Sequence, residues 1–218
     1  MDYTELYECQ QLCVERSIDA EISRGVVFSN KPRIRNLCKY GYLVLMDSTH
    51  KTNVLSWQLY TLMVRSNEGS WLPVAWFYTE KADGDIIRES LKTIRAWCRP
   101  FGGWRLRYSI TDDSAAEQAG FNEAFPGILE GEMKPTTLLC RKHADRTLVR
   151  RFGHEKYANT LRHMRTALYT RKTKLGCEDS IERAIRALPK TPANQRRADE
   201  NYIRKEWARN TEQVSLCS

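Results

Sequence analysis

The hydrophobic pattern of the chain is clearest between residues 41 and 53. There, five consecutive apolar residues, Tyr42 to Met46, are followed by Asp47 and then by small and polar residues. An apolar run of this length is typical of a strand covered on both faces. A charge at the exit of such a strand lies where open α/β sheets place ligands and metals, although aspartate is also a common turn residue. The pattern predicts a central strand that ends in a carboxylate, with a simple turn as the alternative.

The apolar periodicity after this strand predicts further elements in the order strand, strand, helix, strand, helix, strand. Their expected ranges are 57–65, 70–79, 83–99, 104–111, 114–124 and 136–140. The first two form a hairpin, and Pro73 in its second arm is expected at an edge or a bulge because it cannot donate to a ladder. The strand over 104–111 ends at Asp112 and Asp113. Asp112 is the favoured counterpart of Asp47, since Asp113 lies one residue further on, where it can cap the next helix.

The two ends of the chain have a helical pattern. Leu6, Cys9 and Cys13 recur near helical spacing, and apolar residues do so again after His143. We therefore expect an α/β fold with a mixed five-stranded sheet flanked by helices. Its parts are a helical lead-in over 1–40, a core over 41–143 and a basic helical extension over 144–218.

Charge is distributed unevenly along the chain. Residues 141–210 carry 19 Lys and Arg against 8 Asp and Glu, whereas the rest of the chain has a slight acidic excess. A local excess of this size suits a polyanion such as nucleic acid, and a solvated set of helices without a partner is the alternative. Seven scattered cysteines without a Cys-x-x-Cys pair predict reduced thiols, and the absence of a signal-peptide pattern or an apolar run of about 18 residues predicts an intracellular protein outside membranes.

Four ordered motifs resemble the transposase domain of Mutator-like elements (MULE), which are DDE transposases with a ribonuclease H-like fold. The motifs are MDSTHKTN at 46–53, PVAWFYTE at 73–80, ITDDSAAEQAGFNEAFP at 110–126 and LLCRKH at 138–143. The resemblance implies that Asp47 and Asp112 are catalytic carboxylates that bind Mg²⁺ or Mn²⁺. It also implies double-stranded DNA as the partner, as transposon ends and target, in the nucleus, and it is compatible with a homo-oligomer.

Other residues are candidates for supporting roles. Cys140 and His143 match the Cys-x-x-His element of that family; they are half of a zinc site, and a structural role without zinc is the favoured alternative. Lys51, after the first acid, is either a phosphate contact or an ordinary exposed lysine. The basic helices supply further candidates for phosphate contacts: Arg141, Lys142, Arg150 and Arg151.

The family also requires a third carboxylate on a late helix, and the segment that would carry it is missing before the chain stops at Ser218. Glu178, Glu182, Glu200 and Glu206 are substitutes, but each is better interpreted as a solvated residue of an amphipathic helix. The first hypothesis is therefore an incomplete transposase catalytic domain. The second is a non-catalytic, DNA-binding or regulatory protein derived from a transposase, and the third is an unrelated α/β domain whose acids are turn residues.

Overall fold

The computed structural model of the chain describes residues 7–112, 114–127 and 134–207. The chain divides into two compact units, Met1–Thr137 and Leu138–Ser218. The division falls between residues 137 and 138, whereas the sequence analysis placed it after residue 143. Within the described ranges, no helix combines the length and the apolar character needed to cross a membrane.

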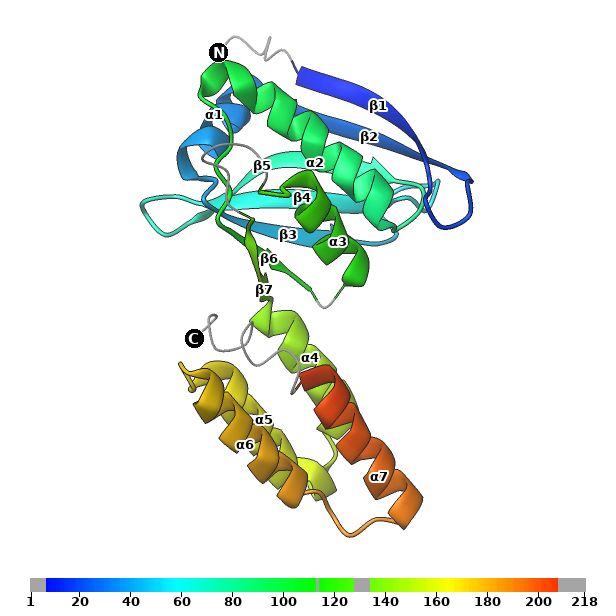
Figure 1. The fold of residues 1–218 in the computed structure, drawn as a ribbon, viewed down its shortest axis with the longest axis vertical. Helices are drawn as coiled ribbons and strands as arrows, with labels where there is room; N and C mark the ends of the chain where they lie inside the picture. The colour runs from blue at the N-terminus through cyan, green and yellow to red at the C-terminus, as the bar shows by residue number, and fades with distance from the viewer. Residues whose placement is uncertain (1–6, 113, 128–133, 208–218) are drawn as a thin grey trace. The chain divides into compact units, whose positions relative to one another are not determined.

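Unit 1 is built around one sheet whose strands lie in the order β1-β2-β5-β4-β3-β6-β7 (Figure 1). The neighbouring pairs β1-β2, β2-β5, β5-β4 and β4-β3 are antiparallel, and β3 pairs with β6 in parallel. From β1 to β7 the strands span Tyr7–Glu15, Ile22–Asn30, Leu43–Thr49, Gln58–Arg65, Trp71–Thr79, Tyr108–Thr111 and Thr136–Leu139. The last strand spans the boundary between the two units.

The predicted central part of this sheet is confirmed. The apolar run forms β3 from Leu43 onward, but only Val44 and Met46 of it are fully buried and Tyr42 is 57% exposed, so burial alternates along the strand instead of covering both faces as expected. The expected hairpin forms β4 and β5, which pair with a register shift at the level of Pro73. That bulge accommodates a residue that cannot donate a hydrogen bond to the ladder. The predicted α/β class, a mixed sheet with flanking helices, is therefore observed.

The helical lead-in is wrong for residues 7–30, which form the antiparallel hairpin β1-β2 and extend the sheet from five strands to seven. Residues four apart share a face in a strand as well as in a helix, so the Cys9 and Cys13 spacing did not distinguish the two. Both cysteines are exposed, while Leu12 and Val14 on the alternate positions pack against the core. Among the described residues of the predicted lead-in, only the last ten are helical, as α1 (Lys31–Tyr40).

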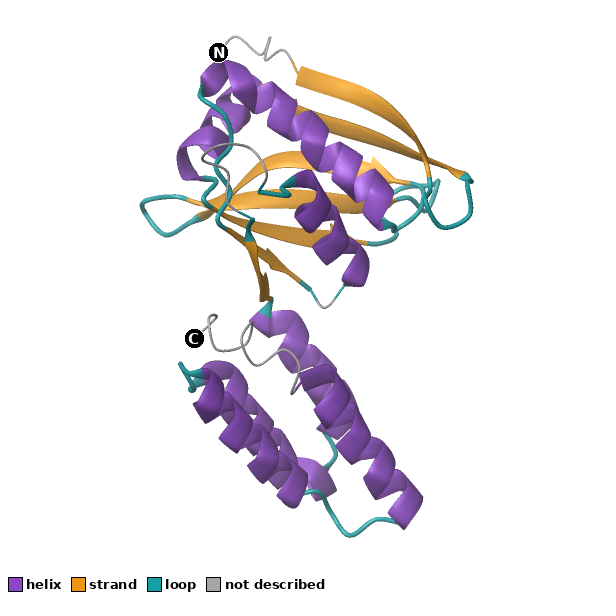
Figure 2. Ribbon diagram, viewed as in Figure 1, coloured by secondary structure: helices purple, strands orange, loops and turns teal. Residues whose placement is uncertain are grey.

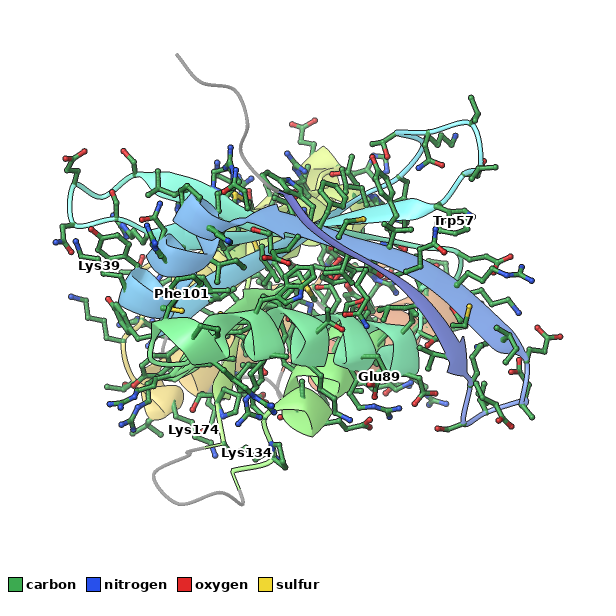
Figure 3. The ribbon with its side chains drawn as sticks, turned by 90° about the horizontal axis from the view of Figure 1, so that it is seen from above. Lys39, Trp57, Glu89, Phe101, Lys134 and Lys174 are labelled. Carbon is green, nitrogen blue, oxygen red and sulfur yellow. The ribbon has the colours of Figure 1, made fainter. Side chains whose placement is uncertain are left out.

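Three helices of unit 1, α1, α2 (Gly84–Cys98) and α3 (Ala115–Ala124), lie on one face of the sheet (Figures 2 and 3). Helix α2 begins as predicted at Asp83, whose carboxylate accepts a hydrogen bond from the backbone N–H of Ile86, and it buries a regular apolar stripe. Helix α3 approaches α2 closely at Gly120, where a Cβ atom would lie 2.4 Å from Cγ2 of Ile87. This close packing fixes the position of the first turn of α3, next to the end of β6.

Unit 2 consists of helices α4 (Arg141–Phe152), α5 (Ala158–Tyr169), α6 (Lys174–Arg186) and α7 (Ala193–Tyr202), the last continuing as a π-helical turn, Ile203–Trp207. The helices enclose a second hydrophobic core that includes Leu148, Phe152, Met164 and Ile181. The predicted helical extension thus has a core of its own.

Candidate functional site

The two predicted acids lie near the carboxyl ends of neighbouring parallel strands: Asp47 is inside β3, which continues two residues beyond it, and Asp112 directly follows β6. The register of β3 and β6 pairs Leu43 with Tyr108 and Leu45 with Ile110, a constant offset of 65 residues. The same offset, continued past the last paired residues, brings Asp112 to the level of Asp47. Adjacent strands lie about 4.8 Å apart. The sheet therefore brings together two carboxylates that are far apart in the sequence, at the carboxyl ends of their strands, where α/β sheets bind ligands.

A third acid, Glu117, lies beside Asp112 and within electrostatic reach of Asp47; we call these three residues the acid cluster, although among the described residues no three such side chains form a ready metal-binding group. It lies in the first turn of α3 and is only 1% exposed. Its pKa is raised from 4.5 to about 8, mainly by burial and then by the negative charge of Asp112. A hydrogen bond between the two side chains and the charge of Asp47 also contribute to the rise, while a backbone hydrogen bond at Asp112 opposes it. Glu117 is therefore mostly protonated at neutral pH in the protein alone.

Two oxygen atoms in this cluster are buried without a hydrogen-bond partner among the residues that the structure describes. They are Oδ1 of Asp112 and Oε2 of Glu117. A buried acceptor without a partner costs about 1–3 kcal/mol, so these two oxygens are suited to accept a further ligand or donor. Carboxylate oxygens are the ligands that Mg²⁺ and Mn²⁺ prefer, and one or two of them suffice for Mg²⁺, which keeps several waters. The donor set therefore fits a hard divalent cation.

Tyr60 lies next to the acids. It is a buried residue of β4 whose ring stacks on Phe77 at 4.8 Å between centroids. Burial and the negative charges of Glu117, Asp112 and Asp83 raise the pKa of its hydroxyl above the ordinary value. The hydroxyl therefore stays protonated.

The loop after β3 carries Lys51, which is exposed and has a φ of +60°. The side chain of Asn53 closes this loop: its Nδ2 donates to the carbonyl of Trp57 at 2.7 Å, and its Oδ1 accepts from the N–H of Trp57 at 3.1 Å (Trp57 is labelled in Figure 3). Between them, Val54 and Leu55 are 100% and 67% exposed. Lys51 thus precedes the part of the loop that Asn53 closes, and its contact with phosphate stays a prediction.

Cys140 and His143 lie together at the start of α4, where Cys140 is the N-cap residue. In the described ranges, no three His, Cys, Asp or Glu side chains are arranged as a ready metal-binding group. Cys177, a candidate for completing a zinc site, is buried in the core of unit 2, where its thiol donates to the carbonyl of Ala167 at 3.6 Å. Zinc at this position therefore stays a prediction. Asp113, the alternative to Asp112, lies outside the described residues.

The predicted phosphate contacts of α4 differ in their surroundings. Lys142 and Arg150 are exposed, and so is Arg146 between them, which the sequence analysis did not single out. Residues four apart lie on one face of a helix, so these three form a basic stripe. Arg151 instead donates to the buried Asp199 at 3.2 Å. Two guanidinium nitrogens of Arg141, Nε and Nη2, are buried and have no hydrogen-bond partner among the described residues.

Two of the four substitutes for the third carboxylate are held by one arginine of unit 2. Glu182 and Glu200 accept from Arg204 at 2.7 Å and 3.0 Å. Within unit 1, the acid beside Asp112 is Glu117, which the sequence analysis missed. Its signal was hidden because Ser114-x-x-Glu117 is the pattern of an ordinary capping box, and Ser114 does accept from the N–H of Glu117 at 3.4 Å. Its hydrogen bond with the side chain of Asp112 distinguishes it from an ordinary cap.

A family model matches residues 5–129, more than half of the 218 residues. It describes the RNase H-like domain of zinc finger SWIM domain-containing protein 1/3. The matched range contains all three acids of the cluster. No curated protein matches the chain.

Proposed function

The chain belongs to the family of RNase H-like domains of zinc finger SWIM domain-containing protein 1/3, and from this premise we propose that it is a metal-dependent DNA-cleaving domain of the MULE type of DDE transposase. The observation that carries the proposal is the parallel register of β3 and β6, which brings Asp112 to the level of Asp47. The proposed partner is double-stranded DNA in the nucleus.

In this proposal, Asp47 and Asp112 hold Mg²⁺ or Mn²⁺ through their carboxylate oxygens. A bound divalent cation lowers the pKa of water and stabilises the charge that develops during displacement at a phosphodiester. Water oxygen forms the new bond to phosphorus while the bond to the 3′-oxygen of one nucleotide breaks, and that oxygen takes up a proton. In strand transfer, the released 3′-hydroxyl is the next nucleophile. The chain's own contribution is to fix two oxygen donors on adjacent strands, with Tyr60 kept neutral beside them.

A nicking assay with supercoiled plasmid tests the proposal. We expect the full chain to nick DNA with Mn²⁺ or Mg²⁺ and not with EDTA, and Asp47→Asn or Asp112→Asn to reduce the rate by about 100-fold or more, because loss of even outer partners of a metal site costs 10–100-fold. Glu68→Gln, an exposed acid in the β4-β5 turn, is the matched control and keeps the activity.

The second candidate, a non-catalytic DNA-binding protein, is favoured by the basic stripe on α4, which needs no metal. DNA binding without nicking by the unaltered chain, unchanged in both aspartate variants, would establish this candidate and reject the first. Nicking that persists in both aspartate variants would also reject the proposed site.

A further inference from the structure

The least expected residue of the acid cluster is Glu117. Its side chain is buried within the domain, and Oε2 has no hydrogen-bond partner among the described residues. A glutamine or an apolar residue would avoid the cost of a carboxyl group at this position. The buried Oε2 therefore calls for a hydrogen-bond donor that the described residues do not provide.

The surroundings of Glu117 favour a cation on the side of the aspartates. Its electrostatic neighbours are Asp112 and Asp47, both negative, and the nearby Tyr60 is neutral. The first turn of a helix stabilises a carboxylate through the helix dipole, so α3 supports the charged form once a cation offsets the repulsion between the acids. The first turn of α3, which carries Glu117, is held close to α2, because Gly120 packs α3 tightly against α2 one turn later.

We propose that Glu117 is the third acid of the divalent-cation site, a positioning residue that accepts a hydrogen bond from a cation-bound water beside Asp112. The proposal rests on the proposed function, since it uses the same pair of aspartates. The described acids do not already form a three-ligand group, so we assign Glu117 to the outer shell rather than to direct coordination. Mg²⁺ keeps several waters when proteins bind it, and outer partners of this kind orient the ligands and strengthen binding.

Mn²⁺ binding by the full chain, measured by calorimetry without DNA, tests this role. We expect Glu117→Gln to weaken Mn²⁺ binding by about 10–100-fold, because it removes the charge with little change of shape. Asp47→Asn and Asp112→Asn are expected to abolish binding. Glu123→Gln, on the same helix and paired at the surface with Arg88, is the matched control and is expected to bind like the unaltered chain. Mn²⁺ should also raise the Tm of Glu117→Gln less than that of the unaltered chain at the same concentration.

The outcomes separate this inference from the proposed function. If Glu117→Gln binds Mn²⁺ as tightly as the unaltered chain while both aspartate variants do not bind, Glu117 has no role at the cation and only this inference fails. If the unaltered chain does not bind Mn²⁺, the inference and the proposed cation site both fail. Should Glu117→Gln not fold, Glu117→Asp keeps the charge on a shorter side chain. We expect about tenfold weaker binding from it, and unchanged binding would overturn the inference.

Discussion

At the scale of single residues, the protonation of Glu117 links the acid cluster to stability. In the metal-free folded chain its pKa is raised to about 8, whereas in the unfolded chain it is near the ordinary value of 4.5. Between these values the folded state holds a proton that the unfolded state has lost. Stability must therefore fall as the pH rises through this window, and the loss is complete only above the folded-state pKa.

We predict that the Tm of the chain in EDTA falls by about 5 °C or more between pH 5 and pH 9, given that 1 kcal/mol shifts the Tm of a chain of this size by roughly 2–4 °C. Glu117→Gln, which cannot titrate, should have a much flatter profile and a higher Tm at pH 9. Thermal melts followed by circular dichroism measure both effects. A Tm for the unaltered chain that is constant or rises over this range would contradict the proposed environment of Glu117.

At the scale of elements, the site depends on how α3 packs against α2. Alanine is a better helix former than glycine by about 1 kcal/mol, so Gly120→Ala would stabilise an isolated helix. In the folded protein the added Cβ would lie 2.4 Å from Cγ2 and 2.9 Å from Cβ of Ile87, and the latter atom cannot move without the backbone of α2.

We predict that Gly120→Ala lowers the free energy of unfolding by about 1–3 kcal/mol, as overpacking of a core does. Urea denaturation measures the change. The control is Gly176→Ala in α6, whose added Cβ would meet mainly the side chains of Thr173 and Arg171, and we expect its effect to be below about 1 kcal/mol because these side chains can move aside. Equal effects of the two substitutions would show that the contact between α2 and α3 is not tight.

The elements also show which parts of the structure the sequence could predict. The apolar residues before Asp47 specify β3 locally. The cap at Asp83 and the apolar stripe that follows it specify α2, so both elements were predictable. The hairpin β1-β2 was not, because the spacing of Cys9 and Cys13 suits one face of a strand as well as one face of a helix. Asp47 and Asp112 could be proposed as a pair because each lies near the end of a strand that the local pattern predicts. The buried position of Glu117 depends on packing between helices, and it was missed.

At the scale of the whole molecule, the acidic cluster and the basic stripe belong to different units, each with its own hydrophobic core. Within the described residues, Lys142, Arg146 and Arg150 of α4 have no ion-pair partner, whereas Arg151 is neutralised by Asp199. Free cations on one helix face are available to phosphates. Binding and chemistry should therefore be separable by substitution.

We predict that replacing Lys142, Arg146 and Arg150 together by alanine weakens binding to double-stranded DNA. The slope of log K against log salt should fall by about 2–3, at roughly 0.9 for each phosphate that is no longer neutralised. Fluorescence anisotropy between about 50 and 200 mM salt measures the slope. The control replaces three exposed arginines of unit 1, Arg65, Arg99 and Arg105. An equal loss of affinity in both triple variants would indicate a general charge effect, and an unchanged slope would reject the stripe as a DNA-binding surface.

The parallel register of β3 and β6 has a further consequence for how the sequence can vary. Insertions in the turn between β4 and β5 change the number of residues between Asp47 and Asp112, yet they leave the pairing of β3 with β6 intact. A deletion of one residue inside β6 preserves almost the whole sequence, yet it turns every later side chain of that strand to the opposite face. We therefore expect natural length variation to occur in the turns, and the strand ends to tolerate none. The site is defined by strand register rather than by a fixed interval between the acids.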